Sequence, residues 1–189
     1  VLPFIEEYDF PALRCMISAG EACPAGLATR WAGKRSFFNA YGPTEVTVCA
    51  TAGRFEGGKR VPIGWPIENA RLYVLDERLA QVPVGVAGEL YIAGAGLARG
   101  YLGRAGMTAE RYVADPYGGG RRMYRSGDRV RVMENGALEF LGRVDHQVKR
   151  RGFRIELGEI EQAMLTHESV QQVLVVDKER KEHDVDIVA

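Results

Sequence analysis

The 189-residue sequence predicts a mixed α+β fold of the α/β class, and three observations support this. Short apolar segments typical of strands alternate with segments that have helical periodicity. Between Gly53 and Gly142, Gly and Pro interrupt several short strands, which indicates a barrel-like β region. After Gly142 the sequence becomes basic and then predicts a β-α-β unit, so we expect a domain boundary between Arg143 and Gln147.

The first quarter of the chain predicts a strand, a helix, a turn and a second strand. Leu13–Ser18 is a short apolar run typical of a buried strand. A helix is expected between Pro24, which the first helical turn tolerates, and Gly33, where a helix would stop. The apolar "SFF" then leads into a predicted turn, "NAYGPTE" (Asn39 to Glu45), and the β-branched "VTVCAT" predicts the next strand.

The rest of the chain predicts mainly strands. The clearest are "ARLYVLD", "GELYIAG", "DRVRVM" and "LEFLG", and "ENGA" predicts a hairpin because Asn-Gly accepts the positive φ values of a type I′ turn. A helix is expected near "MTAERYV", with Thr108 as its N-cap. Further on, "RVDHQVKRRGFRIEL" predicts an exposed, basic strand pair. A helix follows at Glu159 to Thr166, and "VQQVLVVD" alternates into another strand.

The composition argues against several classes of protein. The 25 basic and 25 acidic side chains cancel, which removes the positive charge expected of a nucleic-acid or anionic-membrane binder. No run approaches the roughly 20 apolar residues of a membrane span. Cys15, Cys23 and Cys49 suit neither a disulfide framework nor a zinc site, so a reducing, cytoplasmic setting is expected. The absence of an initiator Met and the apolar end of the chain indicate a piece of a longer protein.

The stretch "FFNAYGPTEVTVCAT" carries the densest polar chemistry in the sequence. Asn39, Tyr41, Thr44 and Glu45 place an amide, a phenol, a hydroxyl and a carboxylate within seven residues. Such a mixture suits a nucleotide better than it suits a core. Taken alone, however, "YGPTE" remains more typical of an ordinary turn.

Four segments resemble, in order and spacing, the successive motifs of one enzyme family. They are "NAYGPTE" (39–45), "GELYIAGAGLARGYL" (88–102), "YRSGD" (124–128) and "GRVDHQVKRRGFRIELGEIE" (142–161). Together they resemble the adenylation domains of nonribosomal peptide synthetases, members of the adenylate-forming ligase superfamily. The resemblance implies that residues 1–144 are the end of the large N-terminal subdomain, with the nucleotide and substrate pocket. It implies that 145–189 are the hinge and the start of the small, mobile α+β C-terminal subdomain.

The resemblance also implies an activity. Such an enzyme uses ATP and Mg²⁺ to convert an amino acid into an aminoacyl-AMP, and it then passes the aminoacyl group to a phosphopantetheine thiol. The partners would be peptidyl carrier and condensation domains of the same synthetase. Carried onto this sequence, Tyr41 would stack on adenine and Asn39 would contact its exocyclic amine. Thr44 and Glu45 would be catalytic, Thr44 by holding the α-phosphate and Glu45 by helping to bind Mg²⁺.

Three further residues receive roles from the later motifs. Asp128 would accept hydrogen bonds from both ribose hydroxyls, for which a carboxylate is suited. Arg143 would lie near the same sugar and phosphate. Asp145 would be the hinge about which the C-terminal subdomain swings.

Five positions are implied to line the amino-acid pocket: Ile17, Ala19, Ala40, Val48 and Cys49. All are small or apolar, so this lining offers no partner for a charged side chain, and burying one unpaired would be costly. The lining resembles that of phenylalanine-activating domains. A hydrophobic amino acid is therefore expected as substrate, and the resemblance suggests an aromatic, phenylalanine-like one.

The resemblance also sets what the isolated chain is expected to do. The family's phosphate-binding loop and the aspartate that pairs with the substrate amine are expected upstream of Val1. The family's catalytic lysine is expected downstream of Ala189, so adenylation by this chain alone should be negligible. Two alternatives stay open, namely a fragment of an acyl- or aryl-CoA ligase and a non-catalytic, truncated nucleotide-binding module.

Overall fold

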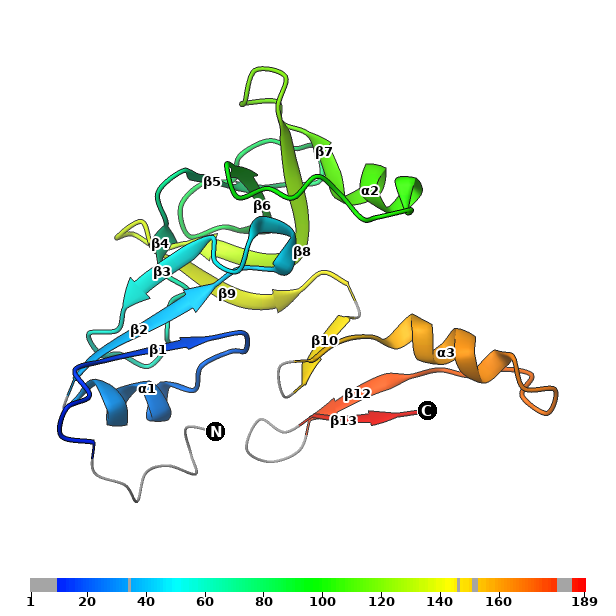
Figure 1. The fold of residues 1–189 in the computed structure, drawn as a ribbon, viewed down its shortest axis with the longest axis horizontal. Coiled ribbons are helices and arrows are strands. Elements are labelled where there is room, and N and C mark those ends of the chain that lie inside the picture. Colours follow the sequence, from blue (N-terminus) through cyan, green and yellow to red (C-terminus); the bar gives the residue numbers. More distant parts are fainter. Residues whose placement is uncertain (1–9, 34, 146, 151–152, 180–184) are drawn as a thin grey trace. The chain divides into compact units, whose positions relative to one another are not determined.

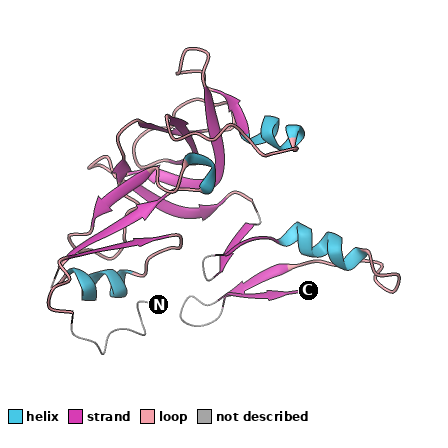
Figure 2. Ribbon diagram, viewed as in Figure 1, coloured by secondary structure: helices cyan, strands magenta, loops and turns pink. Residues whose placement is uncertain are grey.

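The computed structural model describes residues 10–33, 35–145, 147–150, 153–179 and 185–189. The chain divides into two compact units, residues 1–142 and 143–189. Figure 2 shows that strands dominate the first unit and that helices are few and short, which confirms the predicted mixed α+β class. Among the described residues, no helix has both the length and the apolar character needed to cross a membrane.

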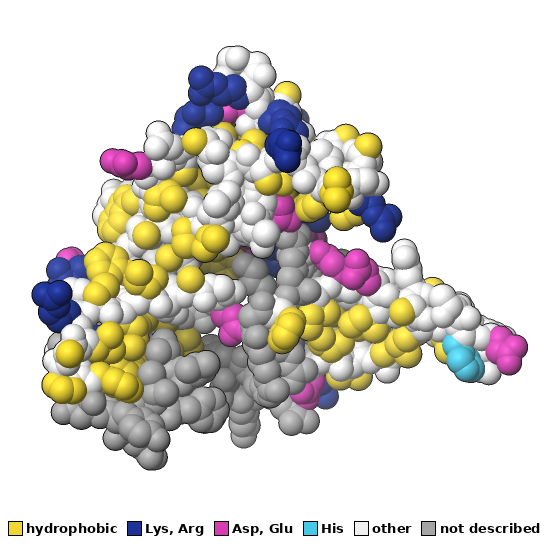
Figure 3. Space-filling view, viewed as in Figure 1, with side chains coloured by type: hydrophobic (Ala, Val, Ile, Leu, Met, Phe, Trp, Pro, Cys, Tyr) yellow, Lys and Arg dark blue, Asp and Glu magenta, His cyan; other side chains and the backbone are white. Residues whose placement is uncertain are grey.

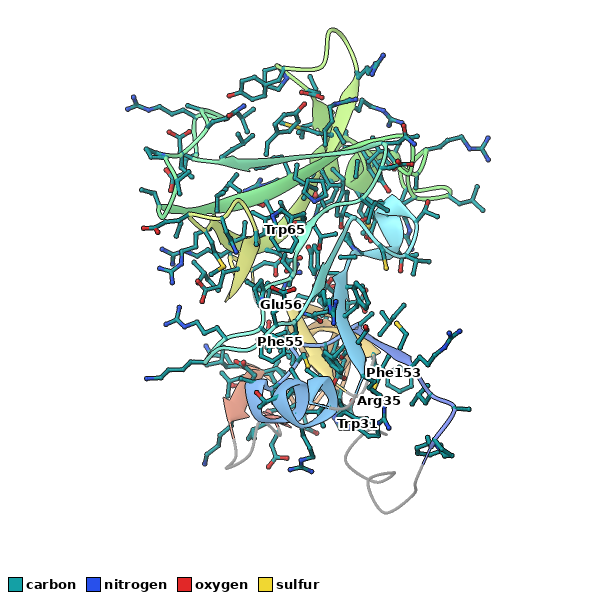
Figure 4. All side chains as sticks on the ribbon, turned by 90° about the vertical axis from the view of Figure 1, so that its left-hand side faces the viewer. Trp31, Arg35, Phe55, Glu56, Trp65 and Phe153 are labelled. Atoms are coloured by element: carbon teal, nitrogen blue, oxygen red, sulfur yellow. The ribbon has the colours of Figure 1, made fainter. Side chains whose placement is uncertain are left out.

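A four-stranded sheet opens the first unit, in the order β1-β2-β3-β4 (Figure 1). Its strands are β1 (Cys15–Ala19), β2 (Ser36–Tyr41), β3 (Thr51–Arg54) and β4 (Trp65–Pro66). β1 and β2 are parallel, so the chain crosses between them through the predicted helix, α1 (Ala25–Ala32). Trp31 of α1 packs in a cluster with Phe37 and Phe55, and Arg35 lies 4.8 Å from the centre of the Trp31 ring (Figure 4).

The second sheet of this unit is curled into a half-barrel, which confirms the predicted barrel-like region. Its order is β5-β6-β8-β7, and β9 also pairs with β8. The strands are β5 (Ala70–Leu75), β6 (Ala87–Gly94), β7 (Tyr112–Ala114), β8 (Arg122–Val132) and β9 (Leu138–Arg143). A short helix, α2 (Ala105–Arg111), precedes β7.

The main hydrophobic core joins these two sheets. Tyr41 at the end of β2 and Val46 just after it are buried in this core. Leu90 of β6 and Tyr124 and Val130 of β8 belong to the same core. The end of β2 and the turn that follows it are therefore fixed by packing against the curled sheet.

A glycine next to β4 allows the chain to pass very close to β3. Gly64, next to β4, has a φ of +88°, and a Cβ added to it would come within 2.2 Å of the carbonyl carbon of Ala52. The carbonyl oxygen of Gly64 accepts a hydrogen bond of 2.9 Å from the backbone N–H of Leu138 in β9. Because only glycine suits both the dihedral angle and the space beside Ala52, the close approach of this segment to β3 depends on Gly64.

The predicted turn and strand around residues 39–51 were wrong in their boundaries. Residues 39–41 belong to β2, and the next strand, β3, starts only at Thr51. Thr47 and Val48 take left-handed φ values of 62° and 66°, so the chain folds back on itself. This brings the N–H of Ala50 to the carbonyl oxygen of Tyr41, at 2.8 Å. The β-branched residues that predicted a strand therefore lie in a tight loop.

Two details of the curled sheet also differ from expectation. Thr108 lies inside α2 rather than at its N-cap, and its hydroxyl accepts a hydrogen bond of 2.9 Å from the backbone N–H of Tyr101.

The hairpin at "ENGA" is confirmed, since it connects β8 to β9. Its turn is not type I′, because Gly136 has a positive φ and Asn135 does not. Five residues separate the two strands, a loop longer than the two-residue turn that favours type I′.

The described part of the second unit contains two antiparallel strand pairs and one helix. These are β10 (Gln147–Arg150) with β11 (Phe153–Glu156), α3 (Leu157–Leu165), and β12 (Val176–Glu179) with β13 (Val185–Val188). The strand predicted from "VQQVLVVD" starts only at Val176. The preceding backbone instead bonds to α3, through Val175 N–H and the Glu161 carboxylate at 2.8 Å.

Some predictions for the second unit are not tested. The expected exposure of the basic strand pair concerns the side chains of residues 149–151 and 154, which lie outside the described residues. The boundary between the units, after Gly142, lies two residues before the division predicted at residue 144. The subdomain roles assigned to 1–144 and 145–189 stay predictions.

Gly64→Ala should lower the free energy of unfolding by about 2 kcal/mol or more, because the new Cβ meets the Ala52 backbone at a positive φ. The matched control is Gly26→Ala, in α1, where a Cβ would meet nothing within 4 Å. That change should stabilise by about 0.5–1 kcal/mol through helix propensity. Denaturant unfolding of both variants measures the difference, and equal stabilities would contradict the role given to Gly64.

Candidate nucleotide-binding site

The end of β2 brings Tyr41 into contact with Asp128 of β8. The Tyr41 hydroxyl donates a hydrogen bond to the Asp128 carboxylate, across 87 positions of sequence. Both residues are buried, with exposed fractions of 7% for Tyr41 and 1% for Asp128. Two residues that the sequence assigned to one nucleotide site are therefore adjacent in the fold.

A bulge in β8 directs Asp128 into the core. Glu89 of β6 pairs with Arg129 and Tyr91 pairs with Arg125, so two steps along β6 correspond to four along β8. Such a bulge re-aims the side chains of the extra residues. The sequence carried a signal for it, because a glycine within a strand pattern often marks a bulge, and Gly127 has a φ of +74°.

Ser126 holds the bulge in place. Its hydroxyl donates to the carbonyl oxygen of Leu90 at 2.6 Å and accepts the backbone N–H of Asp128 at 3.0 Å. The hydroxyl therefore replaces ladder hydrogen bonds that the bulge interrupts. Sequence reasoning missed this residue, since its partner is set by the register of β6 and β8.

The turn after β2 presents one exposed and one buried polar side chain. Thr44–Val46 form a single 3₁₀ turn that follows Pro43. Thr44 is exposed, whereas Glu45 is 6% exposed. The Glu45 carboxylate accepts a hydrogen bond of 2.6 Å from the hydroxyl of Tyr101. Tyr101 lies in the motif "ARGYL", but the sequence gave no indication that its hydroxyl would meet Glu45.

Three of the predicted residues make contacts outside the Tyr41–Asp128 pair. Asn39 is buried, and its side-chain amide donates to the carbonyl oxygen of Pro62 at 2.9 Å. Arg143 and Asp145 belong to the second unit, where they form a bidentate ion pair with distances of 2.6 and 2.8 Å. Their roles at adenine, at the ribose and as a hinge stay predictions.

Three of the five predicted pocket residues share one face of β1 and β2. Ala19 pairs directly with Ala40, and Ile17 lies two residues earlier in β1, so the three side chains point the same way. Ala40 is buried, whereas Ile17 is 66% exposed. Exposed apolar side chains are common on the first unit, and Figure 3 shows hydrophobic side chains gathered on the face toward the viewer.

The other two pocket residues, Val48 and Cys49, lie in the loop that folds back over Gly42. A Cβ on Gly42 would come within 2.7 Å of the Val48 carbonyl oxygen and the Cys49 Cα. The loop thus passes directly over the residue that follows Tyr41. Val48 is 73% exposed, and Cys49 lines a small cavity of about 30 Å³.

The donor set suits a magnesium ion that arrives with its nucleotide. Within the described residues, no group of three or more His, Cys, Asp or Glu side chains could hold a metal ion. Magnesium bound with nucleotides commonly uses one or two carboxylates together with substrate phosphates. Glu45 supplies one carboxylate, and Thr44 places a hydroxyl next to it in the sequence. These residues fit a shared metal better than a permanent metal site.

Known proteins resemble this chain throughout its length. The family model described as "AMP-binding enzyme" matches residues 3–102. Bacitracin synthase 3 of Bacillus licheniformis is 51% identical over 97% of this chain, which spans 3% of that protein. A solved nonribosomal peptide synthetase (NRPS) protein with adenylation and carrier (PCP) domains, bound to a vinylsulfonamide inhibitor, superimposes with a TM-score of 0.82. It is 33% identical, with 90% of this chain and 31% of that one covered.

A second solved structure is a four-domain nonribosomal peptide synthetase bound to AMP and glycine. It has a TM-score of 0.66 and 41% identity, with 90% of this chain and 13% of that one covered. The family match covers more than half of the chain, and the relatives match almost all of it. The chain therefore belongs to the AMP-binding enzyme family, as part of an adenylation domain of the nonribosomal peptide synthetase type.

Proposed function

We propose that this chain supplies the nucleotide site and part of the substrate pocket of an enzyme that forms aminoacyl-AMP from ATP and a hydrophobic amino acid. The observation that carries the proposal is the buried Tyr41–Asp128 pair, followed four residues along the chain by the buried carboxylate of Glu45. Asp and Glu are seldom fully buried unless they are paired, and here one of these two buried acids directly follows the exposed Thr44 in the sequence.

Asp128 is the proposed ribose ligand. An ionised carboxylate can accept from two adjacent hydroxyls at once, and each bond to a charged acceptor contributes more than a neutral one. In the structure Tyr41 already donates to this carboxylate. Because Asp128 is 1% exposed, a ribose can reach it only if neighbouring side chains move. The Tyr41 ring, which sits beside Asp128, is the proposed stacking surface for adenine.

Thr44 and Glu45 are the proposed catalytic residues. Thr44 is exposed at the start of a 3₁₀ turn, where a hydroxyl can donate to a phosphate oxygen. Glu45 would hold Mg²⁺ together with the phosphates of ATP, and the ion would neutralise charge on those phosphates. The carboxylate of Glu45 supplies an oxygen ligand of the kind that Mg²⁺ prefers.

The proposed product leaves by transfer to a phosphopantetheine thiol on a carrier domain, with condensation domains as further partners. Solved relatives that join adenylation and carrier domains support this proposal. Asp145 is the proposed hinge, and its bidentate pairing with Arg143 would have to follow the backbone when the hinge turns. Three free cysteines suit the proposed cytoplasmic location.

Val48 is the best-supported residue of the proposed pocket. Its φ of 66° is unfavourable for a β-branched residue, and its side chain is 73% exposed. Neither backbone preference nor burial in this chain explains a valine here. Strain of this kind is concentrated at functional sites. A role in contacting a hydrophobic substrate accounts for both features.

A truncated, non-catalytic nucleotide-binding module is the remaining alternative. The same Tyr41–Asp128 pair would serve binding without chemistry. The two functions differ in their response to an amino acid, because only the enzyme exchanges pyrophosphate into ATP when its amino acid is present. The high identity to a peptide synthetase favours the enzyme over a CoA ligase.

Asp128→Asn should weaken AMP binding at least about tenfold in the protein that carries this sequence, because the ribose loses a charged acceptor. Asn keeps the shape and can still accept from Tyr41. The control is Asp76→Asn, an exposed aspartate that caps its own turn through Arg78 N–H and Ala80 N–H. Calorimetric titration gives both affinities, and an unchanged affinity in Asp128→Asn would refute its role as ribose ligand.

In the protein that carries this sequence, Val48→Asp should lower phenylalanine-dependent pyrophosphate exchange by about 10- to 100-fold, because the substrate side chain would bury a carboxylate. The thermal midpoint should hardly change, since Val48 is 73% exposed. Val84→Asp, at a valine that is 60% exposed, is the matched control and should leave exchange unchanged. Equal activity of the two variants would remove Val48 from the pocket.

A further inference from the structure

We propose that Tyr101 is a positioning residue that fixes the orientation of Glu45 for binding the magnesium ion of ATP. The inference rests on the proposed function, because it requires Glu45 to be a metal ligand. It goes beyond that function by assigning a role to a hydroxyl in a different motif, 56 residues further along the chain.

The contact between the two side chains is short and shielded from solvent. The Tyr101 hydroxyl lies 2.6 Å from Oε1 of Glu45, and Glu45 is 6% exposed. An ionised carboxylate only accepts hydrogen bonds, so the phenol hydroxyl of Tyr101 is the donor in this contact. A carboxylate can accept several contacts, so this bond is compatible with a metal contact.

Tyr101 is itself held from several sides. Its backbone N–H donates to the Thr108 hydroxyl at 2.9 Å. Its ring meets Tyr112 edge to face, with ring centres 5.7 Å apart. The side chain of Tyr124 also lies close to the Tyr101 hydroxyl. These contacts from α2, β7 and β8 restrict the ring, so its hydroxyl has a fixed position.

The backbone of the Glu45 turn is attached to the same segment. The backbone N–H of Ala98 donates to the carbonyl oxygen of Glu45 at 2.8 Å, and the Thr47 hydroxyl donates to the carbonyl oxygen of Gly96 at 2.8 Å. Residues 96–101 therefore hold the turn through its backbone and its acidic side chain. Tyr101 contributes the bond that sets the rotamer of Glu45.

The expected effect follows from how outer partners act on metal ligands. Removing a group that orients a ligand typically lowers metal affinity or activity by about 10- to 100-fold. Tyr101→Phe removes one hydroxyl and keeps the ring that packs on Tyr112. Loss of the Tyr101 hydroxyl should therefore raise the metal concentration required to form the metal–nucleotide complex on the protein. The affinity for nucleotide in the absence of metal should hardly change.

The test uses the protein that carries this sequence, with Mn²⁺ as a paramagnetic probe and a nonhydrolysable ATP analogue. Electron paramagnetic resonance measures how tightly Mn²⁺ binds to the protein–nucleotide complex, which does not depend on turnover. The control is Tyr91→Phe, which removes the hydroxyl from another phenol–carboxylate contact, with Glu89 at 3.4 Å, in a separate core cluster. Thermal unfolding of each variant accompanies the titration.

The proposal predicts Mn²⁺ affinity about 10- to 100-fold weaker in Tyr101→Phe and unchanged in Tyr91→Phe. A double-mutant cycle with Glu45→Gln should be non-additive, because Tyr101 acts only through Glu45. If Glu45→Gln weakens Mn²⁺ binding and Tyr101→Phe does not, the positioning role is overturned and the metal role of Glu45 stands. If neither variant weakens Mn²⁺ binding, the metal role of Glu45 and the positioning role of Tyr101 are both overturned. Equal losses of Mn²⁺ affinity in Tyr101→Phe and Tyr91→Phe would also overturn the positioning role, because they would indicate a general effect on stability.

Discussion

The packing of the end of β2 against the curled sheet is the constraint on which the site depends. Tyr41 belongs to the main core, and its hydroxyl reaches Asp128 of β8. Neither residue could be placed by its own strand alone, because they lie 87 positions apart. Once the core has formed, the turn after β2 and the bulge of β8 have fixed positions relative to each other. The geometry of the site is thus a consequence of core packing.

The structure keeps local strain at this point instead of relaxing it. Thr47 and Val48 both have left-handed backbone conformations, which are costly for β-branched residues. Gly42 allows the strained loop to lie directly over the end of β2. The hydrogen bond from Ala50 N–H to Tyr41 then closes the loop. Local preference is therefore overridden by tertiary contacts, which is common where a backbone serves a site.

The sequence predicted the family, the fold class and the helix between Pro24 and Gly33, because these depend on motif order and local periodicity. The predictions from sequence were wrong where tertiary contacts determine the local structure. "VTVCAT" has strand propensity, yet core burial of Val46 and the loop over Gly42 outweigh it. Thr108 has the chemistry of an N-cap but bonds to Tyr101 instead. The Glu45–Tyr101 contact had no sequence signal, since it depends on how two distant motifs pack.

Two of the four buried carboxylates among the described residues of the first unit, Asp128 and Glu45, each lie against a tyrosine hydroxyl. Asp128 accepts from Tyr41 and Glu45 accepts from Tyr101, so a phenol partly compensates each acid for lost hydration. A phenol suits this position because its ring packs in the core while its hydroxyl donates. An apolar pair would stabilise the core more simply, because the free energy lost when a charged group leaves water usually exceeds the free energy gained from its buried partner. The other two of these buried acids have arginine partners, since Asp115 lies near Arg71 and Glu139 pairs with Arg60 and Arg131. Asp128 and Glu45 accept from phenols, and a neutral phenol leaves the negative charge of each acid available to a charged ligand.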